Sequence, residues 1–468
     1  MITGVDVSEL QALQDSIAGK AVVRGSDGYD VVYRPPIVRF QEIRPRAVVL
    51  CATANDVGAT LSFVRQSGAG LAIRSGGHCF AGRSSTDGIV IDVSPMNAVS
   101  VADGIATVGA GARLGDVYDA LEAHGVTIAG GCGPSVGIAG LALGGGLGVL
   151  GRRYGLTCDQ LLGAEVVLAD GRVVECDDDR DPDLFWALRG AGAGQFGVIT
   201  ALALRTVPAP MTTTFDLAWP VASGARLIEA WQRWAPAAPD DLAASLLAVA
   251  HADPADPPVV HVFGTMLGTR AQAVTLLESL IADVGEDPAV SRIGQGSFRA
   301  AKRDLAEHGP GDAPVGSPPE HEYSRSDFFR ATLPADAIAA LVDNFATEGK
   351  AGHRRTLDFT PWGGAYNRIP PEATAFAHRA ERFLLKHGVA LPAAVSDTER
   401  DDARAWLARS WSLVHAYGSG GVYPNFPDPE LDDPARAYYG ANLERLRRVK
   451  AAYDPDDLFR FPGSIAPA

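Results

Sequence analysis

The stretch RSGGH at residues 74–78 joins two short apolar segments, residues 71–74 and 88–93, that are typical of β-strands. Two consecutive glycines allow backbone N–H groups to converge on a phosphate, and Arg74 adds a positive charge beside them. A phosphate cradle and an ordinary tight turn fit these five residues equally well, so the rest of the chain has to decide between them.

The composition bounds the function. The chain has 468 residues, about two to three times a typical domain, and 47% of them are hydrophobic, which predicts two domains with large cores. Its net charge of −15 argues against a nucleic acid or an anionic membrane as partner. No signal-peptide pattern or long apolar run occurs, so we expect a cytoplasmic protein. Five cysteines without CxxC spacing, and histidines without ligand spacing, predict no disulfide framework and no metal.

Periodicity divides the chain into three parts. Up to residue 207 short strands dominate, among them a strand and helix over residues 46–67 with Asn55 or Asp56 as N-cap, and a hairpin over residues 164–174. Amphipathic helices then alternate with strands, and an irregular aromatic stretch and a final helix follow. In this second half we predict helices over 224–234, 270–284, 335–346, 373–387 and 435–453, strands over 259–265 and 356–361, and a loop over 309–319.

A second glycine-rich stretch, GGCGPSVGIAGLALGGGLG, covers residues 130–148. Its main chain must lie against something flat or anionic, because so many positions lack a side chain. Residues 146–151 also match GxGxxG, with Asp170 about 20 residues further on, as a dinucleotide-binding fingerprint requires. No β-branched strand precedes these glycines and residues 152–155 interrupt the helix that should follow, so a Rossmann unit is disfavoured.

RSGGH, followed by SSTDGIVIDVS at residues 84–94, resembles a segment of the FAD-linked oxidases of the vanillyl-alcohol-oxidase and p-cresol-methylhydroxylase superfamily, in particular the berberine-bridge-enzyme-like subgroup. The resemblance implies FAD bound covalently through a ring nitrogen of His78. It also implies an α+β fold with two domains: an FAD-binding domain at 1–207, a substrate domain of helices on an antiparallel sheet at 208–417, and a segment at 418–468 that returns to the FAD domain.

The glycine-rich stretch at 130–148 resembles the flavin-embracing segment of the same family. Bicovalent members carry a cysteine three residues before the Val-Gly step, where this chain has Gly133, so a second link through Cys132 is the less favoured alternative. Val136 stands where the family has a small gate residue, which implies dioxygen as electron acceptor. The expected cofactor-binding residues are Arg74, Ser75, Gly76, Gly77, His78, Cys132, Gly133, Val136, Gly137, Gly140, Gly144, Gly197, Val198, Ile199, Tyr423 and Asn425.

The closing segment YPNFPD at residues 423–428 resembles the part of the family that passes the flavin ring. Related sugar oxidases use a tyrosinate there as base, which implies this role for Tyr423, while Asn425 is expected to fix the flavin. Asp358, on an alternating strand of the second domain, could orient Tyr423 or could be an exposed surface carboxylate. Tyr366 and Tyr417 are weaker catalytic candidates.

The reaction implied is hydride transfer from a C–H next to oxygen or nitrogen of a small molecule to FAD, with reoxidation by O2 to give H2O2. Two alternatives stay open: a flavin dehydrogenase with another electron acceptor, and a flavin-bearing binding protein without turnover. The sequence leaves the substrate and the oligomeric state unknown.

Overall fold

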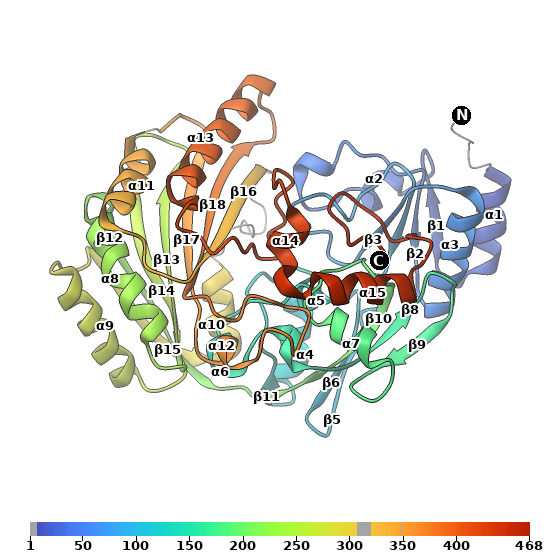
Figure 1. Cartoon of the computed structure of the whole chain (residues 1–468), viewed down its shortest axis with the longest axis horizontal. Helices are drawn as coiled ribbons and strands as arrows, with labels where there is room; N and C mark the ends of the chain where they lie inside the picture. The colour runs from blue at the N-terminus through green and yellow to red at the C-terminus, as the bar shows by residue number, and fades with distance from the viewer. Residues whose placement is uncertain (1–6, 307–319, 348) are drawn as a thin grey trace.

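The computed structural model describes residues 7–306, 320–347 and 349–468, and its strands form three main sheets (Figure 1). None of the helices in these ranges is both long and apolar enough to cross a membrane. The loop expected over residues 309–319 lies outside the described residues. A cavity lies between these sheets and is lined by residues from each of them.

The first sheet has the order β1-β2-β4-β3. Its helix α3 (Ala54–Ser67) begins after Thr53, whose hydroxyl accepts from the Asp56 backbone N–H while the Asp56 carboxylate accepts from that of Thr53. The N-cap therefore lies two to three positions before the predicted one. The RSGGH segment follows the carboxyl end of β3, which runs parallel to β4. The strands are β1 (Lys20–Val23), β2 (Ala47–Leu50), β3 (Leu71–Arg74) and β4 (Ile89–Asp92).

The second sheet is antiparallel, with the order β5-β6-β10-β8-β9. The predicted hairpin is confirmed, because β8 pairs with β9 on either side of a turn at Asp170-Gly171, where Gly171 has φ 88°. The strands are β5 (Val99–Ala102), β6 (Ile105–Gly109), β8 (Leu161–Val167), β9 (Val173–Cys176) and β10 (Val198–Arg205). Elements between β6 and β8 include α4 (Leu114–Glu122), the two-residue strand β7 (Val126–Thr127), which pairs with β11 (Val207–Pro208), and α5 (Ile138–Leu143) and α6 (Gly151–Tyr154).

The third sheet has seven antiparallel strands in the order β15-β12-β14-β13-β17-β18-β16. One face is covered by helices, which Figure 1 shows along one side of the molecule. Alternate residues of β17 separate the faces, since Leu357 and Phe359 join the helix-covered core while Asp358 faces the cavity. The elements are α8 (Gly224–Ala237), α9 (Arg270–Val284), α11 (Ala335–Thr347) and α13 (Asp397–His415) with β12 (Met211–Pro220), β13 (Leu242–Ala250), β14 (Val259–Met266), β15 (Val290–Ser297), β16 (Glu320–Phe329), β17 (Arg354–Pro361) and β18 (Phe383–Pro392).

The helix predicted over residues 373–387 is wrong, because β18 begins at Phe383 and lies between β16 and β17. Every residue of this strand except its last is buried. A strand buried on both faces lacks the polar-apolar alternation of a half-exposed one, so its apolar run is not separable from a helix by periodicity. The other three helices predicted in this part are confirmed.

The C-terminal segment leaves the third sheet and returns to the first half of the molecule (Figure 1). The single helix predicted over 435–453 is divided into α14 (Pro434–Tyr439) and α15 (Leu443–Tyr453), because Gly440 adopts φ 49° between them. Helix α15 contacts α7 (Pro182–Leu188), and the buried ammonium of Lys450 donates to the Gln195 carbonyl at 2.8 Å. The GxGxxG match at 146–151 is no Rossmann turn, since it lies between α5 and α6 without a preceding strand.

Candidate functional site

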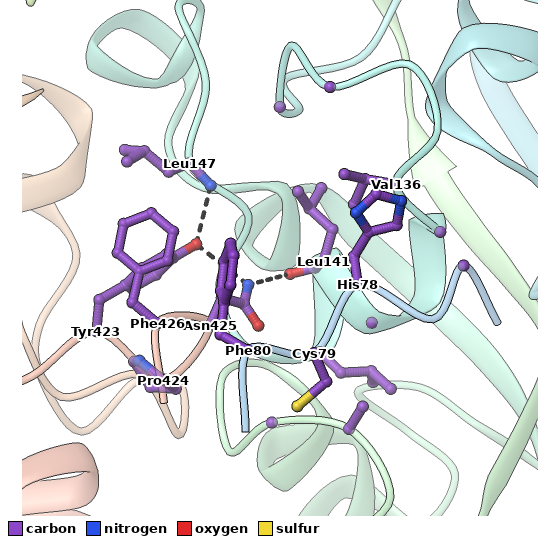
Figure 2. A pocket seen from close by; sticks show the side chains of 18 of the residues that line it. His78, Cys79, Phe80, Val136, Leu141, Leu147, Tyr423, Pro424, Asn425 and Phe426 are labelled. Atoms are coloured by element: carbon purple, nitrogen blue, oxygen red, sulfur yellow. Dashed lines mark hydrogen bonds between the residues drawn. The ribbon is translucent and has the colours of Figure 1, made fainter. Parts of the chain in front are cut away.

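A cavity of about 400 Å³ lies where the three parts of the chain meet, and Figure 2 shows part of its wall. Its walls come from the loop after β3, the glycine-rich stretch, the loop before β10, the cavity face of the third sheet and the closing segment. The sequence-predicted residues that line it are Ser75, Gly76, Gly77, His78, Cys132, Gly133, Val136, Gly137, Gly140, Gly197, Ile199, Asp358, Tyr366, Tyr423 and Asn425. Four predicted residues, Arg74, Gly144, Val198 and the weaker candidate Tyr417, do not line it.

The two glycine-rich segments lie against each other at the cavity wall. A Cβ on Gly76 would stand 2.2 Å from the backbone nitrogen of Gly137, so neither position tolerates a side chain. At Gly140 and Gly192 a Cβ would meet nothing within 4 Å, and both residues line the cavity. Bare backbone therefore faces open space there, as a site for a flat or anionic ligand requires.

Arg74 does not place its charge in this cavity, contrary to the expectation from sequence. Its side chain is buried, and its guanidinium donates to the carbonyls of Ser84 at 3.1 Å and Val32 at 2.9 Å. Gly144 also has a packing role, because a Cβ there would lie 2.1 Å from Oδ1 of Asn425. Both residues shape the loops around the cavity without lining it.

The phenol oxygen of Tyr423 is the focus of a hydrogen-bond cluster (Figure 2). It accepts from the backbone N–H groups of Gly146 at 2.9 Å and Leu147 at 3.1 Å, and from Nδ2 of Asn425 at 3.2 Å. Asn425 is itself held by donating to the Leu141 carbonyl at 2.8 Å. Burial raises the pKa of Tyr423 to about 12, although the three donors act in the opposite direction. The three donors thus favour negative charge on this oxygen and partly offset the effect of burial.

Tyr366 lines the same cavity, but its hydroxyl donates to the Gly148 carbonyl at 3.0 Å. Its ring stacks on Trp362 with centroids 4.4 Å apart, and burial raises its pKa. Trp362 follows the last residue of β17 and is fully buried in an aromatic cluster that also contains Tyr366 and Tyr423. Tyr366 is thus held by packing and by a hydrogen bond that uses its proton. Tyr417, the other weaker candidate, is 45% exposed and lies outside the cavity lining.

Asp358 faces the cavity and is only 9% exposed, so the interpretation as a surface carboxylate is wrong. Burial raises its pKa to about 6, while Lys386 acts to lower it. Lys386 stands opposite Asp358 in the β17–β18 register, and its ammonium lies 4.9 Å from the ring centroids of both Phe80 and Phe426. A carboxyl group with a raised pKa thus lines the cavity beside the strand position of Lys386.

Sequence reasoning missed the cations in and beside this cavity, which include Arg83, Arg152 and Arg460 in its lining and Lys302 beside the glycine-rich stretch. Lys302, on α10 (Phe298–Ala306), is buried, and its ammonium donates to the carbonyls of Gly130 at 2.6 Å and Gly131 at 3.0 Å. The same ammonium lies 3.7 Å from the sulfur of Cys132, and burial lowers its pKa. Arg83, in the loop between β3 and β4, also lines the cavity. Arg83 stands directly before the quoted SSTDG run, whereas no local signal marks Lys302.

Comparisons with known proteins agree with this arrangement. An FAD binding domain family matches residues 45–177, and the family described as berberine and berberine like matches residues 422–466. An uncharacterised FAD-linked oxidoreductase of Bacillus subtilis, YvdP, is 31% identical over 97% of this chain and 99% of its own. A chitooligosaccharide oxidase of Gibberella zeae is 31% identical over 90% of this chain and 87% of its own. The (R)-6-hydroxynicotine oxidase of Paenarthrobacter nicotinovorans is 29% identical over 97% of both chains.

Solved structures show the same fold. A chitooligosaccharide oxidase superposes with a TM-score of 0.84 at 25% identity, over 98% of this chain and 100% of that one. A glucooligosaccharide oxidase of Acremonium strictum, which carries a 6-S-cysteinyl, 8α-N1-histidyl FAD, superposes with a TM-score of 0.87 at 24% identity over 98% of this chain and 99% of that one. The two-domain α+β fold is thereby confirmed. The family matches and the relatives that are 31% identical over most of the chain show that it belongs to the berberine-bridge-enzyme-like family of FAD-linked oxidoreductases.

Proposed function

We propose that this protein is an oxidase that carries FAD covalently on His78 and oxidises a C–H next to oxygen or nitrogen of a small molecule. The observation that carries the proposal is the cluster of three N–H donors on the phenol oxygen of Tyr423, in the same cavity as His78. In this proposal residues 1–207 and 418–468 hold the cofactor, and residues 208–417 supply most of the substrate wall.

The residues present fit an FAD. Backbone without side chains faces open space at Gly140 and Gly192, and His78 borders the same space beside Val136 (Figure 2). Ser75, Gly76 and Gly77 would hold the pyrophosphate, and the segment from Gly197 to Ile199 would hold another part of the cofactor. We propose a single link through His78, with Cys132 as a free thiol beside Lys302.

When bound, FAD would supply the hydride acceptor, and its reoxidation by O2 would give H2O2. Tyr423 acts as the base that takes the hydroxyl or amine proton of the substrate at its phenol oxygen. The N–H groups of Gly146, Leu147 and Asn425 hold that oxygen in place and stabilise its anionic form. Asp358 lines the same cavity from the third sheet and orients the substrate through a polar hydrogen. One proton and one hydride thus leave the substrate together.

The experiment that tests this proposal is an anaerobic screen of alcohols, sugar oligomers and amines for bleaching of the enzyme-bound flavin. We expect at least one compound to bleach it, and air to restore the colour with one H2O2 formed per flavin. Tyr423→Phe should slow the bleaching roughly 100- to 10,000-fold, the usual contribution of general acid–base catalysis. Slow restoration in air with fast restoration by a quinone would instead show a dehydrogenase. A library without any reductant, combined with no effect of Tyr423→Phe, would favour the binding protein.

A further inference from the structure

Arg83 lies beside the segment expected to hold the cofactor pyrophosphate. It belongs to the loop between β3 and β4, and its side chain lines the cavity. The neighbouring Ser84 carbonyl accepts from Nε of Arg74 at 3.1 Å, and Arg74 directly precedes Ser75. The buried guanidinium of Arg74 thus ties the backbone next to Arg83 to the start of the RSGGH turn.

The guanidinium of Arg83 is held in place by aromatic rings. Its Cζ atom lies 4.6 Å from the ring centroid of Phe461 and 5.8 Å from that of Tyr438, both from the C-terminal part of the chain. Such stacking orients the planar fork of an arginine and leaves its N–H groups directed around the ring edge. The C-terminal return of the chain therefore fixes this cation at the cavity wall.

The charge of Arg83 has no protein counterpart among the described residues. Its Nε is buried without a hydrogen-bond partner there, and no described carboxylate forms an ion pair with it. Arg152, another arginine that lines the cavity, also has a buried Nε without a partner, but its terminal nitrogens donate to the carbonyls of Trp362 and Ala238, whereas none of the described residues accepts from Arg83. A buried guanidinium donor without a partner is costly, so the site is suited to an anionic ligand.

We propose that Arg83 binds the pyrophosphate of FAD and supplies the positive charge that sequence reasoning gave to Arg74. This inference rests on the proposed function, because it takes FAD as the occupant of the cavity. A guanidinium presents paired N–H groups that match two phosphate oxygens, and the ion pair forms partly shielded from water. In this role Arg83 binds the cofactor and takes no part in the chemical step.

The test compares FAD with riboflavin, which has the same ring system and no phosphate. The parent is His78→Ala, in which binding is reversible, and dissociation constants are measured by flavin fluorescence. Arg83→Met should weaken FAD binding on the order of 10- to 100-fold, as expected for a lost hydrogen bond to a charged group, and leave riboflavin binding unchanged. Arg83→Lys keeps the charge and should lose less. Arg445→Met removes an arginine stacked on Trp186 that does not line the cavity, and should change neither constant.

Equal weakening of both ligands by Arg83→Met would show a structural role and overturn the inference. Unchanged FAD binding in that variant would overturn it as well. If the unmodified protein carried no FAD and the His78→Ala parent bound neither FAD nor riboflavin, the proposed cofactor itself would be wrong, which is a different outcome from either of these.

Discussion

The phenol of Tyr423 combines two opposing influences at one atom. Three N–H donors favour its anion, but burial prevails and raises the pKa to about 12. At neutral pH most molecules therefore hold the phenolic proton, and only the small phenolate fraction can act as a base. We predict that the rate constant for flavin reduction by substrate rises about tenfold per pH unit between about pH 7 and 9, measured by anaerobic stopped flow.

Tyr366→Phe is the matched control for this prediction. Tyr366 lines the same cavity, but its hydroxyl donates a hydrogen bond to the Gly148 carbonyl. The variant should keep the pH slope, whereas Tyr423→Phe should flatten it. A rate constant that is independent of pH over this range in the unmodified enzyme would exclude Tyr423 as the base.

Asp358 provides a second pH dependence at the residue scale. Its pKa is raised to about 6 by burial, so its carboxylate is present above that pH and is lost as the pH falls through it. If the carboxylate orients the substrate, the logarithm of kcat/KM should change with pH with a slope of about two below pH 6 and about one above it. Asp358→Asn should show a slope of about one throughout.

Asp327 is a suitable control for Asp358, since burial also raises its pKa to about 6. It pairs with His415 at 3.1 Å and does not line the cavity. Asp327→Asn should therefore keep the change of slope near pH 6. If the change of slope near pH 6 were lost in Asp327→Asn and kept in Asp358→Asn, the titrating group would be Asp327. That result would refute the role of Asp358.

At the scale of elements, local signals were readable from the sequence and long-range ones were not. Helix α9 matches its predicted bounds because Thr269 caps it at one end and Gly285 ends it at the other. Strand β18 was missed, since burial on both faces removes its period. The bond between Gly146 and Tyr423 joins residues 277 positions apart, so only the resemblance to a family could suggest that they meet. The exchange of roles between Arg74 and Arg83 depends on side-chain directions that no pattern records.

A buried ion pair joins the segment between β17 and β18 to the part of the FAD-binding domain that follows the glycine-rich stretch at residues 130–148. Arg379 donates to both carboxylate oxygens of Asp159, at 2.7 and 2.9 Å, and the two side chains are 1% and 2% exposed. Removing one partner leaves a buried charge uncompensated, so Asp159→Asn and Arg379→Met should each lower the free energy of unfolding by about 3–5 kcal/mol in a denaturant titration.

The control for this pair is Arg180, which also forms two contacts with one carboxylate, that of Asp177, but is 59% exposed. Solvent screens an exposed pair, so Arg180→Met should cost less than about 1 kcal/mol. Equal losses in the buried and exposed variants would show that the Arg379 pair does not hold the segments together.

At the scale of the whole molecule, the cavity exists only because distant parts of the chain close around it. The RSGGH loop supplies His78, the third sheet supplies Asp358, and the C-terminal return supplies Tyr423. Helix α10, which precedes the third sheet's β16 in the chain, reaches back to hold the backbone beside Cys132 through Lys302. The residues proposed to hold the cofactor, orient the substrate and act as base thus each come from a different part of the fold.

Because the cavity depends on the whole fold, denaturation should release a noncovalently bound flavin and retain a covalently bound one. We predict that the acid-denatured protein stays yellow and has the mass of the chain plus one FAD. Cys132→Ser should keep that mass, whereas His78→Ala should lose it. Cys132 lines the same cavity, with its sulfur 3.7 Å from the ammonium of Lys302, so it is the alternative attachment point for the flavin. If His78→Ala kept the flavin and the double variant His78→Ala with Cys132→Ser lost it, the second bond would be on Cys132. The additional residue between Cys132 and Val136 would then not turn the sulfur away from the flavin.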